Sequence, residues 1–374
     1  MSTPDIARTR LPHVLAALYA LAIVYASLQP FSPWIVPGPD VPFFLFEGWP
    51  AYWTRGDVVL NIVAYAPFGF FAGLVPQRMR PWHRAAFAFI VGSALSFTME
   101  TLQMYIPPRD ADVLDLVANS AGALLGGLGA AMLAVDNRAR TAVREVRQRL
   151  FLSERTGDVG LALLVLWLVA QVNPGIPMFG VTYANDNPFG TSQGPIDGAA
   201  LLIEAATSAF QLLGIGVFLA LLLRDRNHAG GAVLLLVGIA LLGKGAAAFA
   251  MLKPAMWQSW IRPGALIGIA AGSLLVPVAI NLPRPAQVAV CAVALLSSIG
   301  IPLLAPELMF ARAPTTWFGW RYGQLLNYNG LTRTVLLAWP IFAAAWLFAL
   351  AGRPRWGAPD APEKPGRRSM SPSL

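Results

Sequence analysis

Three places in the sequence carry the same chemical arrangement, a carboxylate followed three or four residues later by a carboxamide. The pairs are Asp57 with Asn61, Glu100 with Gln103, and Asp115 with Asn119. Residues at this spacing share one face of a helix, so each pair would present an acid and an amide to the same neighbour. Buried carboxylates serve as general acids or bases, and amides orient polar ligands. The pattern therefore predicts a polar binding or catalytic site.

The chain around these pairs is strongly apolar. Only 12% of its 374 residues are charged, 56% are hydrophobic, and the mean hydropathy is +0.57. Runs without Asp, Glu, Lys or Arg recur, and each is about long enough to cross a ~30 Å hydrocarbon core as a helix. Because lipid tolerates only backbones whose hydrogen bonds close internally, the composition predicts an all-α, polytopic bundle of membrane helices.

Ten transmembrane helices are expected, at 11–30, 57–75, 85–106, 112–134, 158–173, 198–223, 231–252, 263–281, 286–304 and 331–352. Most of the 27 Lys and Arg residues fall on one side of this arrangement, so the positive-inside rule places both termini in the cytoplasm. The first helix also fits a signal peptide, but no clean cleavage site precedes a soluble domain, which favours a retained span.

Charge divides the chain into four parts. Residues 1–135 form a four-helix transmembrane domain, 136–157 a basic cytoplasmic linker, 158–352 a six-helix transmembrane domain, and 353–374 a disordered cytoplasmic tail. The linker is expected to form a helix along the inner membrane surface. The sequence pI of about 10.1 reflects topology-determining arginines and gives no reason to expect nucleic acid as a partner.

The acidic stretch would lie in a tight hairpin at the outer side of the membrane. Asp57 and Asp112 also fit simple helix caps, and the amides fit interhelical hydrogen bonds. Glu100 fits neither role, because it lies about two turns inside a helix, where an ionisable group indicates function. Pro67, with Gly69, predicts a kink that opens a cleft to Glu100, and Gly122 and Gly126 form a GxxxG pair for close packing.

The stretches "DVVLNIVAYAPFGF", "SFTMETLQ" and "RDADVLDLVANSAGALLG" resemble the VanZ-like family. The resemblance covers about residues 10–135 and implies a bacterial inner-membrane protein of the cell envelope, in a family named for a member linked to teicoplanin resistance. It implies no defined reaction. The matching positions are Asp57, Asn61, Pro67, Gly69, Glu100, Gln103, Arg109, Asp112, Asp115, Asn119, Gly122 and Gly126.

The second half offers fewer polar groups. Glu204 and Lys244 are expected at similar depths in two helices, where they would form a structural ion pair that fixes helix register. The single cysteine, Cys291, and three scattered histidines give no metal site. Neither GxxxxGK[ST] nor HExxH occurs, so no cofactor is expected.

Three functions fit these residues. In the first, an outer pocket of Asp57, Asn61, Glu100, Gln103, Arg109, Asp112, Asp115 and Asn119 binds a lipid-linked envelope precursor or another amphiphile. Its excess of about three negative charges favours a cation, an amine or a hydroxyl-rich group. In the second, an intramembrane transferase or hydrolase uses Glu100 as acid or base, with Asp115 in support. In the third, a proton-coupled transporter uses Glu100 or the Glu204–Lys244 pair as a relay.

Overall fold

The structure is a computed structural model that describes residues 10–107, 109–152, 155–180, 198–304 and 322–352. Eleven α-helices, three short 3-10 helices and no β-strand occur within these ranges. The α-helices are α1 (Leu11–Leu28), α2 (Arg55–Leu74), α3 (Pro81–Gln103), α4 (Val113–Val135), α5 (Asn137–Leu150), α6 (Arg155–Gln171), α7 (Gly198–Leu222), α8 (Ala229–Met251), α9 (Pro263–Ile280), α10 (Arg284–Leu304) and α11 (Tyr322–Ala351).

The predicted fold class is confirmed. Each of the ten expected helices has a counterpart, and the basic linker supplies an additional helix, α5. In the described part of the chain, nine helices are long and apolar enough to cross a membrane; α6, with 17 residues, is one residue below that length. The side of the membrane on which the termini lie stays a prediction, and the tail at 353–374 falls outside the described residues.

Local chemistry sets where the helices near the acidic stretch begin. Thr54 and Asp57 form a capping box at the start of α2, in which each side chain accepts a hydrogen bond from the other residue's backbone N–H. Asp112 caps α4 by accepting the Asp115 N–H at 2.8 Å. Proline opens α3, where its missing N–H removes no helical bond. These capping residues and the proline explain why α2, α3 and α4 each begin within about one turn of the start expected from the sequence.

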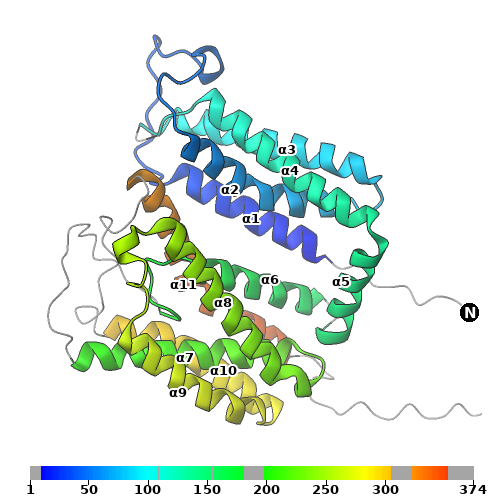
Figure 1. The fold of residues 1–374 in the computed structure, drawn as a ribbon, viewed down its shortest axis with the longest axis vertical. Helices are drawn as coiled ribbons and strands as arrows, with labels where there is room; N and C mark the ends of the chain where they lie inside the picture. The colour runs from blue at the N-terminus through cyan, green and yellow to red at the C-terminus, as the bar shows by residue number, and fades with distance from the viewer. Residues whose placement is uncertain (1–9, 108, 153–154, 181–197, 305–321, 353–374) are drawn as a thin grey trace, which may run out of the picture.

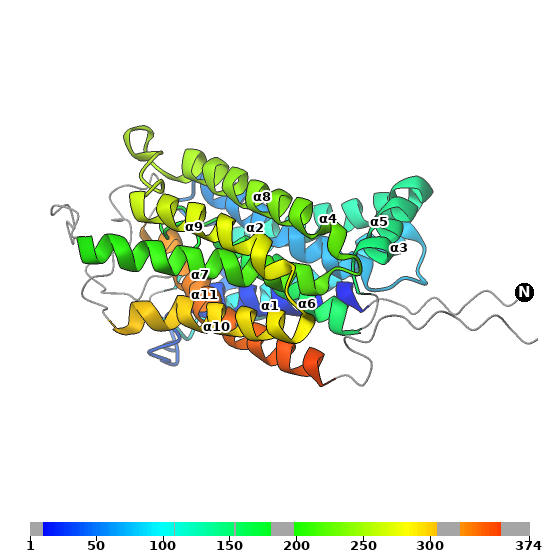
Figure 2. The same ribbon diagram turned by 90° about the horizontal axis from the view of Figure 1, so that it is seen from below.

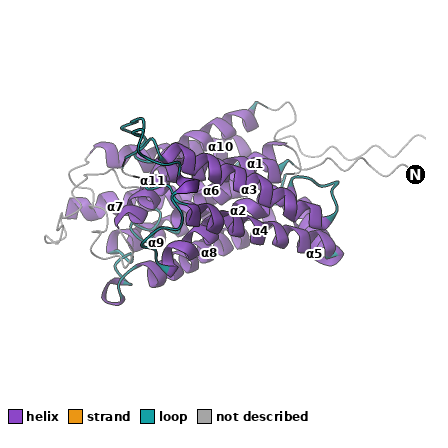
Figure 3. Ribbon diagram, turned by 90° about the horizontal axis from the view of Figure 1, so that it is seen from above, coloured by secondary structure: helices purple, strands orange, loops and turns teal. Residues whose placement is uncertain are grey.

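The spans form two groups that lie side by side, α1–α4 and α6–α11 (Figure 1). Seen from below and from above, the spans of both groups run along a common direction (Figures 2 and 3). In the first group α4 packs against α2 and α3; in the second, the almost fully buried α7 packs against α9 and α10. Large apolar side chains such as Leu234, Leu274 and Phe348 point outward, as lipid-facing residues do.

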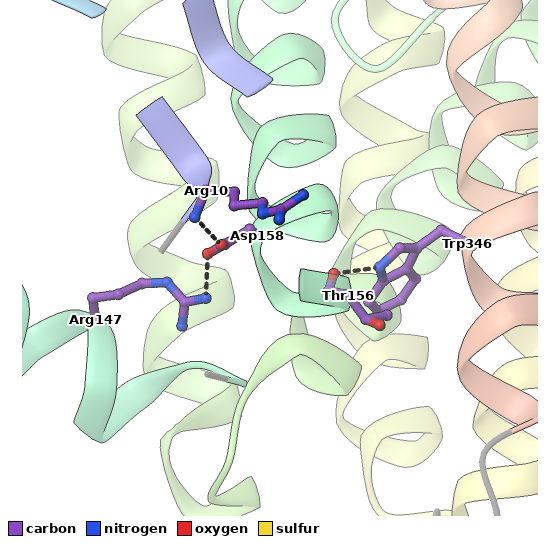
Figure 4. A network of polar contacts seen from close by, with 5 residues as sticks. All are labelled: Arg10, Arg147, Thr156, Asp158 and Trp346. Atoms are coloured by element: carbon purple, nitrogen blue, oxygen red, sulfur yellow. Dashed lines mark hydrogen bonds and ion pairs between the residues drawn. The ribbon is translucent and has the colours of Figure 1, made fainter. Parts of the chain in front are cut away.

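Helix α1 and helix α5 join the two groups. α1 contacts α2 and α3 on one side and α6 and α11 on the other. At the start of α1, the Arg10 backbone N–H donates to the Asp158 carboxylate of α6 at 2.8 Å. The same carboxylate forms an ion pair with Arg147 of α5, also at 2.8 Å (Figure 4). Nearby, the Trp346 indole donates to the Thr156 carbonyl at 2.7 Å. A buried carboxylate thus ties both groups and the linker helix together.

Candidate functional site

Glycine allows α2 and α4 to touch along their backbones. A Cβ atom placed on Gly122 would overlap the Ile62 carbonyl oxygen, and one on Gly126 would overlap the Ala66 carbonyl oxygen. From the other side, a Cβ on Gly69 would overlap the backbone of Ala123. Such close approach is the usual role of small residues between membrane helices. α2 runs unbroken through Pro67, so one continuous helix carries its polar groups to the interface.

Two of the predicted acid–amide pairs meet across this interface. The Asn61 amide of α2 donates to the Asp115 carboxylate of α4. The backbone N–H of Asp112 donates to the Glu100 carboxylate of α3 at 3.2 Å, and the Asp112 side chain in turn caps α4 at Asp115. Glu100, Asp112 and Asp115 are therefore neighbours, and all three helices contribute to one cluster.

The cluster continues inward to groups that are fully buried. Glu100 is 3% exposed and Asn119 is 5% exposed, whereas Asp112 and Asp115 are half-buried. The Asn119 amide donates to the Ser96 hydroxyl at 3.0 Å, but its carbonyl oxygen has no hydrogen-bond partner. A buried acceptor without a partner costs about 1–3 kcal/mol. The deep end of the site therefore offers an unused acceptor.

Tyr65 is a member of this cluster that the sequence analysis missed. Its side chain is 4% exposed, and its hydroxyl lies near Ser96 without a hydrogen bond of good geometry and interacts electrostatically with Glu100 and Asp115. Tyr65 follows Asn61 by four residues, as Glu100 follows Ser96 and Asn119 follows Asp115. The i, i+4 spacing from Asn61 could have identified it, because it places Tyr65 on the same face of α2.

Asp57 lies at the outer rim of the cluster. Its carboxylate is occupied by the capping box and also accepts the Thr54 hydroxyl at 2.6 Å. Asp57 nevertheless adds its charge to the electrostatic field around Asp115, as Asp112 does. The capping role that the sequence allowed for Asp57 and Asp112 is therefore present in the structure, and both charges still face the cluster.

Gln103 and Arg109 make their hydrogen bonds away from the cluster. Gln103 donates to the Ser27 carbonyl at 2.9 Å, and Arg109 donates to the carbonyls of Ala26 and Gln29. These carbonyls lie at the C-terminal end of α1. The last carbonyl groups of a helix have no N–H donor within that helix, so they need donors from elsewhere. Burial lowers the pKa of the Arg109 guanidinium, and the nearby Glu100 carboxylate opposes that shift. Both residues thus hold α1 against the site.

The resulting charge distribution is one-sided. The cluster contains four carboxylates. Arg109 is the cation that interacts with Glu100, but it donates its hydrogen bonds to carbonyls of α1 and its C-terminal cap. The four acids are Asp57, Glu100, Asp112 and Asp115. Within the described ranges no group of three or more His, Cys, Asp or Glu side chains is placed to hold a metal ion. The arrangement suits a ligand that donates hydrogen bonds or carries positive charge.

The expected ion pair in the second half does not form. Glu204 of α7 pairs instead with Arg262, which precedes α9, at 2.8 Å. Lys244 of α8 is fully buried and donates to the carbonyls of Gln171 and Asn173 at 3.0 and 2.6 Å. The end of α6 presents these carbonyls to an apolar interior, where Lys244 satisfies them. Arg262 reaches Glu204 because α9 packs directly on α7.

Comparison with known proteins confirms the resemblance of the first helices. The family model described as VanZ/LLP1 matches residues 14–134, which include α2, α3, most of α1 and α4, and every member of the cluster. No curated protein and no solved structure matches the chain. The match and the apolar helices together make this a multi-pass membrane protein with a VanZ-like N-terminal segment.

Proposed function

We propose that the α2–α4 cluster binds the polar head of a cell-envelope amphiphile at the periplasmic face of a bacterial inner membrane. The head would be an amine or a hydroxyl-rich group, as in a lipid-linked envelope precursor. Asn61, Glu100, Asp112, Asp115 and Asn119 would contact it. Membrane lipids would be the source of the ligand.

The observation that carries this proposal is the buried side-chain oxygen of Asn119, which has no hydrogen-bond partner. The half-buried carboxylates Asp112 and Asp115 lie between it and the end of the bundle. A ligand N–H or O–H that reached Asn119 would satisfy an atom that is otherwise buried at a cost. On the way it would pass Asp115 and the Tyr65 hydroxyl, which can accept or donate. The site is thus complementary to a donor-rich head.

The arrangement of charge along the spans supports the periplasmic assignment. α4 leads from the acidic cluster at Asp112 to the basic helix α5, so the two lie at opposite ends of the first group (Figure 1). Loops rich in Lys and Arg stay in the cytoplasm. The α5 end would therefore be cytoplasmic and the acidic end periplasmic.

An intramembrane transferase or hydrolase is the second candidate, and Tyr65 favours it. The Tyr65 hydroxyl interacts electrostatically with Glu100 and Asp115, which gives a proton donor and two acceptors in the same part of the bundle. Glu100 would be the acid or base, with Asp115 in support. The transporter hypothesis loses one of its two relays, because Glu204 and Lys244 do not pair.

Photolabelling of the full chain in nanodiscs tests the binding proposal. Three probes would carry the same diazirine-bearing alkyl chain and end in an amine, a glucoside or a carboxylate. Peptide mass spectrometry then locates the label. We expect the amine and the glucoside, but not the carboxylate, to label peptides from α2–α4, and Asn119→Leu and Glu100→Gln to reduce this labelling several-fold.

A matched control removes a carboxylate elsewhere. Glu145→Gln changes an exposed glutamate of α5, and labelling of α2–α4 should match the wild type. Equal labelling by all three probes, or insensitivity to Glu100→Gln, would refute the proposal. If Glu100→Gln keeps the labelling yet loses complementation of a glycopeptide-susceptibility phenotype, the enzyme hypothesis gains and the binding hypothesis fails.

A further inference from the structure

The connection between α1 and α2, residues 31–53, carries many exposed aromatic side chains. We call it the α1–α2 loop; it is the blue segment at the upper left of Figure 1. Eight of its 23 residues are aromatic, and only two are charged. Phe46 and Trp49 are 81% and 66% exposed. An exposed apolar surface of this kind marks a site of interaction.

A hydrogen bond and ring contacts hold the α1–α2 loop against α3. The Ile35 backbone N–H donates to the Tyr105 carbonyl, just past the end of α3, at 2.8 Å. Further along the loop, the rings of Phe43 and Phe44 lie 6.0 and 5.9 Å from the ring of Phe97. Phe44 is almost completely buried. The loop therefore crosses the end of α3 and then returns along its side.

Phe97 lies inside the span, on a face of α3 that points outward. It precedes Gln103, the last residue of α3, by six positions, which is roughly 9 Å along a helix. Ile90, two turns deeper on the same face, is 64% exposed. One turn after Phe97, the Thr101 hydroxyl donates to the Phe97 carbonyl at 2.8 Å, which satisfies it without water. The loop thus reaches below the end of the span on the outside of the bundle.

We propose that the α1–α2 loop inserts into the lipid leaflet at the acidic end of the bundle, with Phe46 and Trp49 in contact with acyl chains. The depth of Phe97 and the exposed apolar side chains both fit lipid, and tryptophan favours the headgroup level of a bilayer. Irregular backbone exposed to lipid needs water as a partner, so the loop lies in the interfacial layer and not in the hydrocarbon core. Its two charged residues, Asp40 and Glu47, are exposed and can stay among the headgroups.

Insertion of the α1–α2 loop would also set the depth of the rim of the acidic cluster. The loop ends directly before Thr54, which forms the capping box of α2 with Asp57. An anchor in the lipid interface therefore holds Asp57 close to the headgroups. This contact with lipid does not depend on what the cluster binds.

Spin labels on the full chain in lipid vesicles test the proposal. Nitroxides are attached one at a time through Phe46→Cys and Trp49→Cys, since the native Cys291 is buried. Power-saturation electron paramagnetic resonance then measures their collisions with oxygen and with a water-soluble nickel chelate. Because oxygen partitions into acyl chains and the chelate does not, the ratio of oxygen to nickel collisions should exceed that of an aqueous site roughly fivefold or more.

Two exposed positions calibrate the measurement. Leu234→Cys, on the outward face of α8, gives the ratio for acyl chains, and Asn227→Cys, in the polar turn between α7 and α8, gives the ratio for water. Both loop labels should resemble Leu234→Cys. High nickel accessibility at either loop label would overturn the proposal, because the loop would lie in water. Low accessibility to both reagents would also overturn it, because protein and not lipid would cover the loop.

Discussion

Gly126→Ala is the sharpest perturbation of the interface that builds the acidic cluster. The added Cβ would overlap the Ala66 carbonyl oxygen and come within 2.6 Å of the Phe70 backbone nitrogen. Both are backbone atoms, so no side chain can rotate to make room and α2 must move away from α4. Overpacking of this kind costs about 1–3 kcal/mol.

The displacement should also break the hydrogen bond between Asn61 and Asp115, which spans the same two helices. A hydrogen bond to a charged group contributes roughly 1.5–3 kcal/mol. Together the two effects predict a loss of about 2.5–6 kcal/mol in the free energy of unfolding. Because the cluster depends on this contact, the photolabelling of α2–α4 by an alkylamine should fall as well.

Gly129→Ala is the matched control one turn further along α4. There the added Cβ would lie 3.5 Å from the Phe70 ring, which is ordinary contact. Unfolding free energies come from titration with sodium dodecyl sulfate, and the α2–α4 separation from spin labels placed by Val59→Cys and Val117→Cys. Both parent side chains are exposed. If Gly126→Ala is as harmless as Gly129→Ala, the backbone contact does not hold the site together.

The remaining predictions concern three other contacts. A double-mutant cycle between Glu204 and Arg262 should give a coupling energy of about 0.5–3 kcal/mol, and a cycle between Glu204 and Lys244 should give none; the reverse result would restore the expected pair. Tyr65→Phe removes a hydroxyl that makes no hydrogen bond of good geometry, so stability should stay unchanged while alkylamine labelling falls; an equal loss of both would mean that the hydroxyl is structural. Arg109→Gln should destabilise the end of α1 by roughly 3–6 kcal/mol, since two charge-assisted bonds are lost; unchanged hydrogen exchange in residues 20–30 would contradict that role.

The sequence predicted the helices well because apolar length alone determines a membrane span. It also placed Asn61, Glu100 and Asp115 at similar depths, because helical spacing and distance from the helix ends can be read from the sequence. The hydrogen bond between Asn61 and Asp115 comes only from the structure. Tyr65 was missed because the predicted pattern consists of carboxylates and carboxamides, and a tyrosine side chain is neither. Its hydroxyl becomes a candidate only when α3 and α4 are seen to face it.

The orientation of a helix about its own axis was harder to predict. Gln103 shares a turn with Glu100, yet it faces α1, because α1 packs beside α3 and its last carbonyls need donors. Lys244 and Glu204 were expected at similar depths and α7 contacts α8, but depth does not say which face each helix turns toward the other. Arg262 directly precedes the span expected at 263–281, and only the packing of α9 on α7 brings it to Glu204.

Cysteine accessibility tests the central claim most directly, namely that one recess between α2, α3 and α4 opens to the periplasm. Asn61→Cys and Asp115→Cys report on the recess, and Thr141→Cys reports on the exposed face of α5; the native Cys291 is buried. In intact spheroplasts, a membrane-impermeant maleimide should label the first two variants. Thr141→Cys should react only after permeabilisation. Labelling of Thr141→Cys alone in intact spheroplasts, or labelling of neither recess cysteine there, would contradict the account.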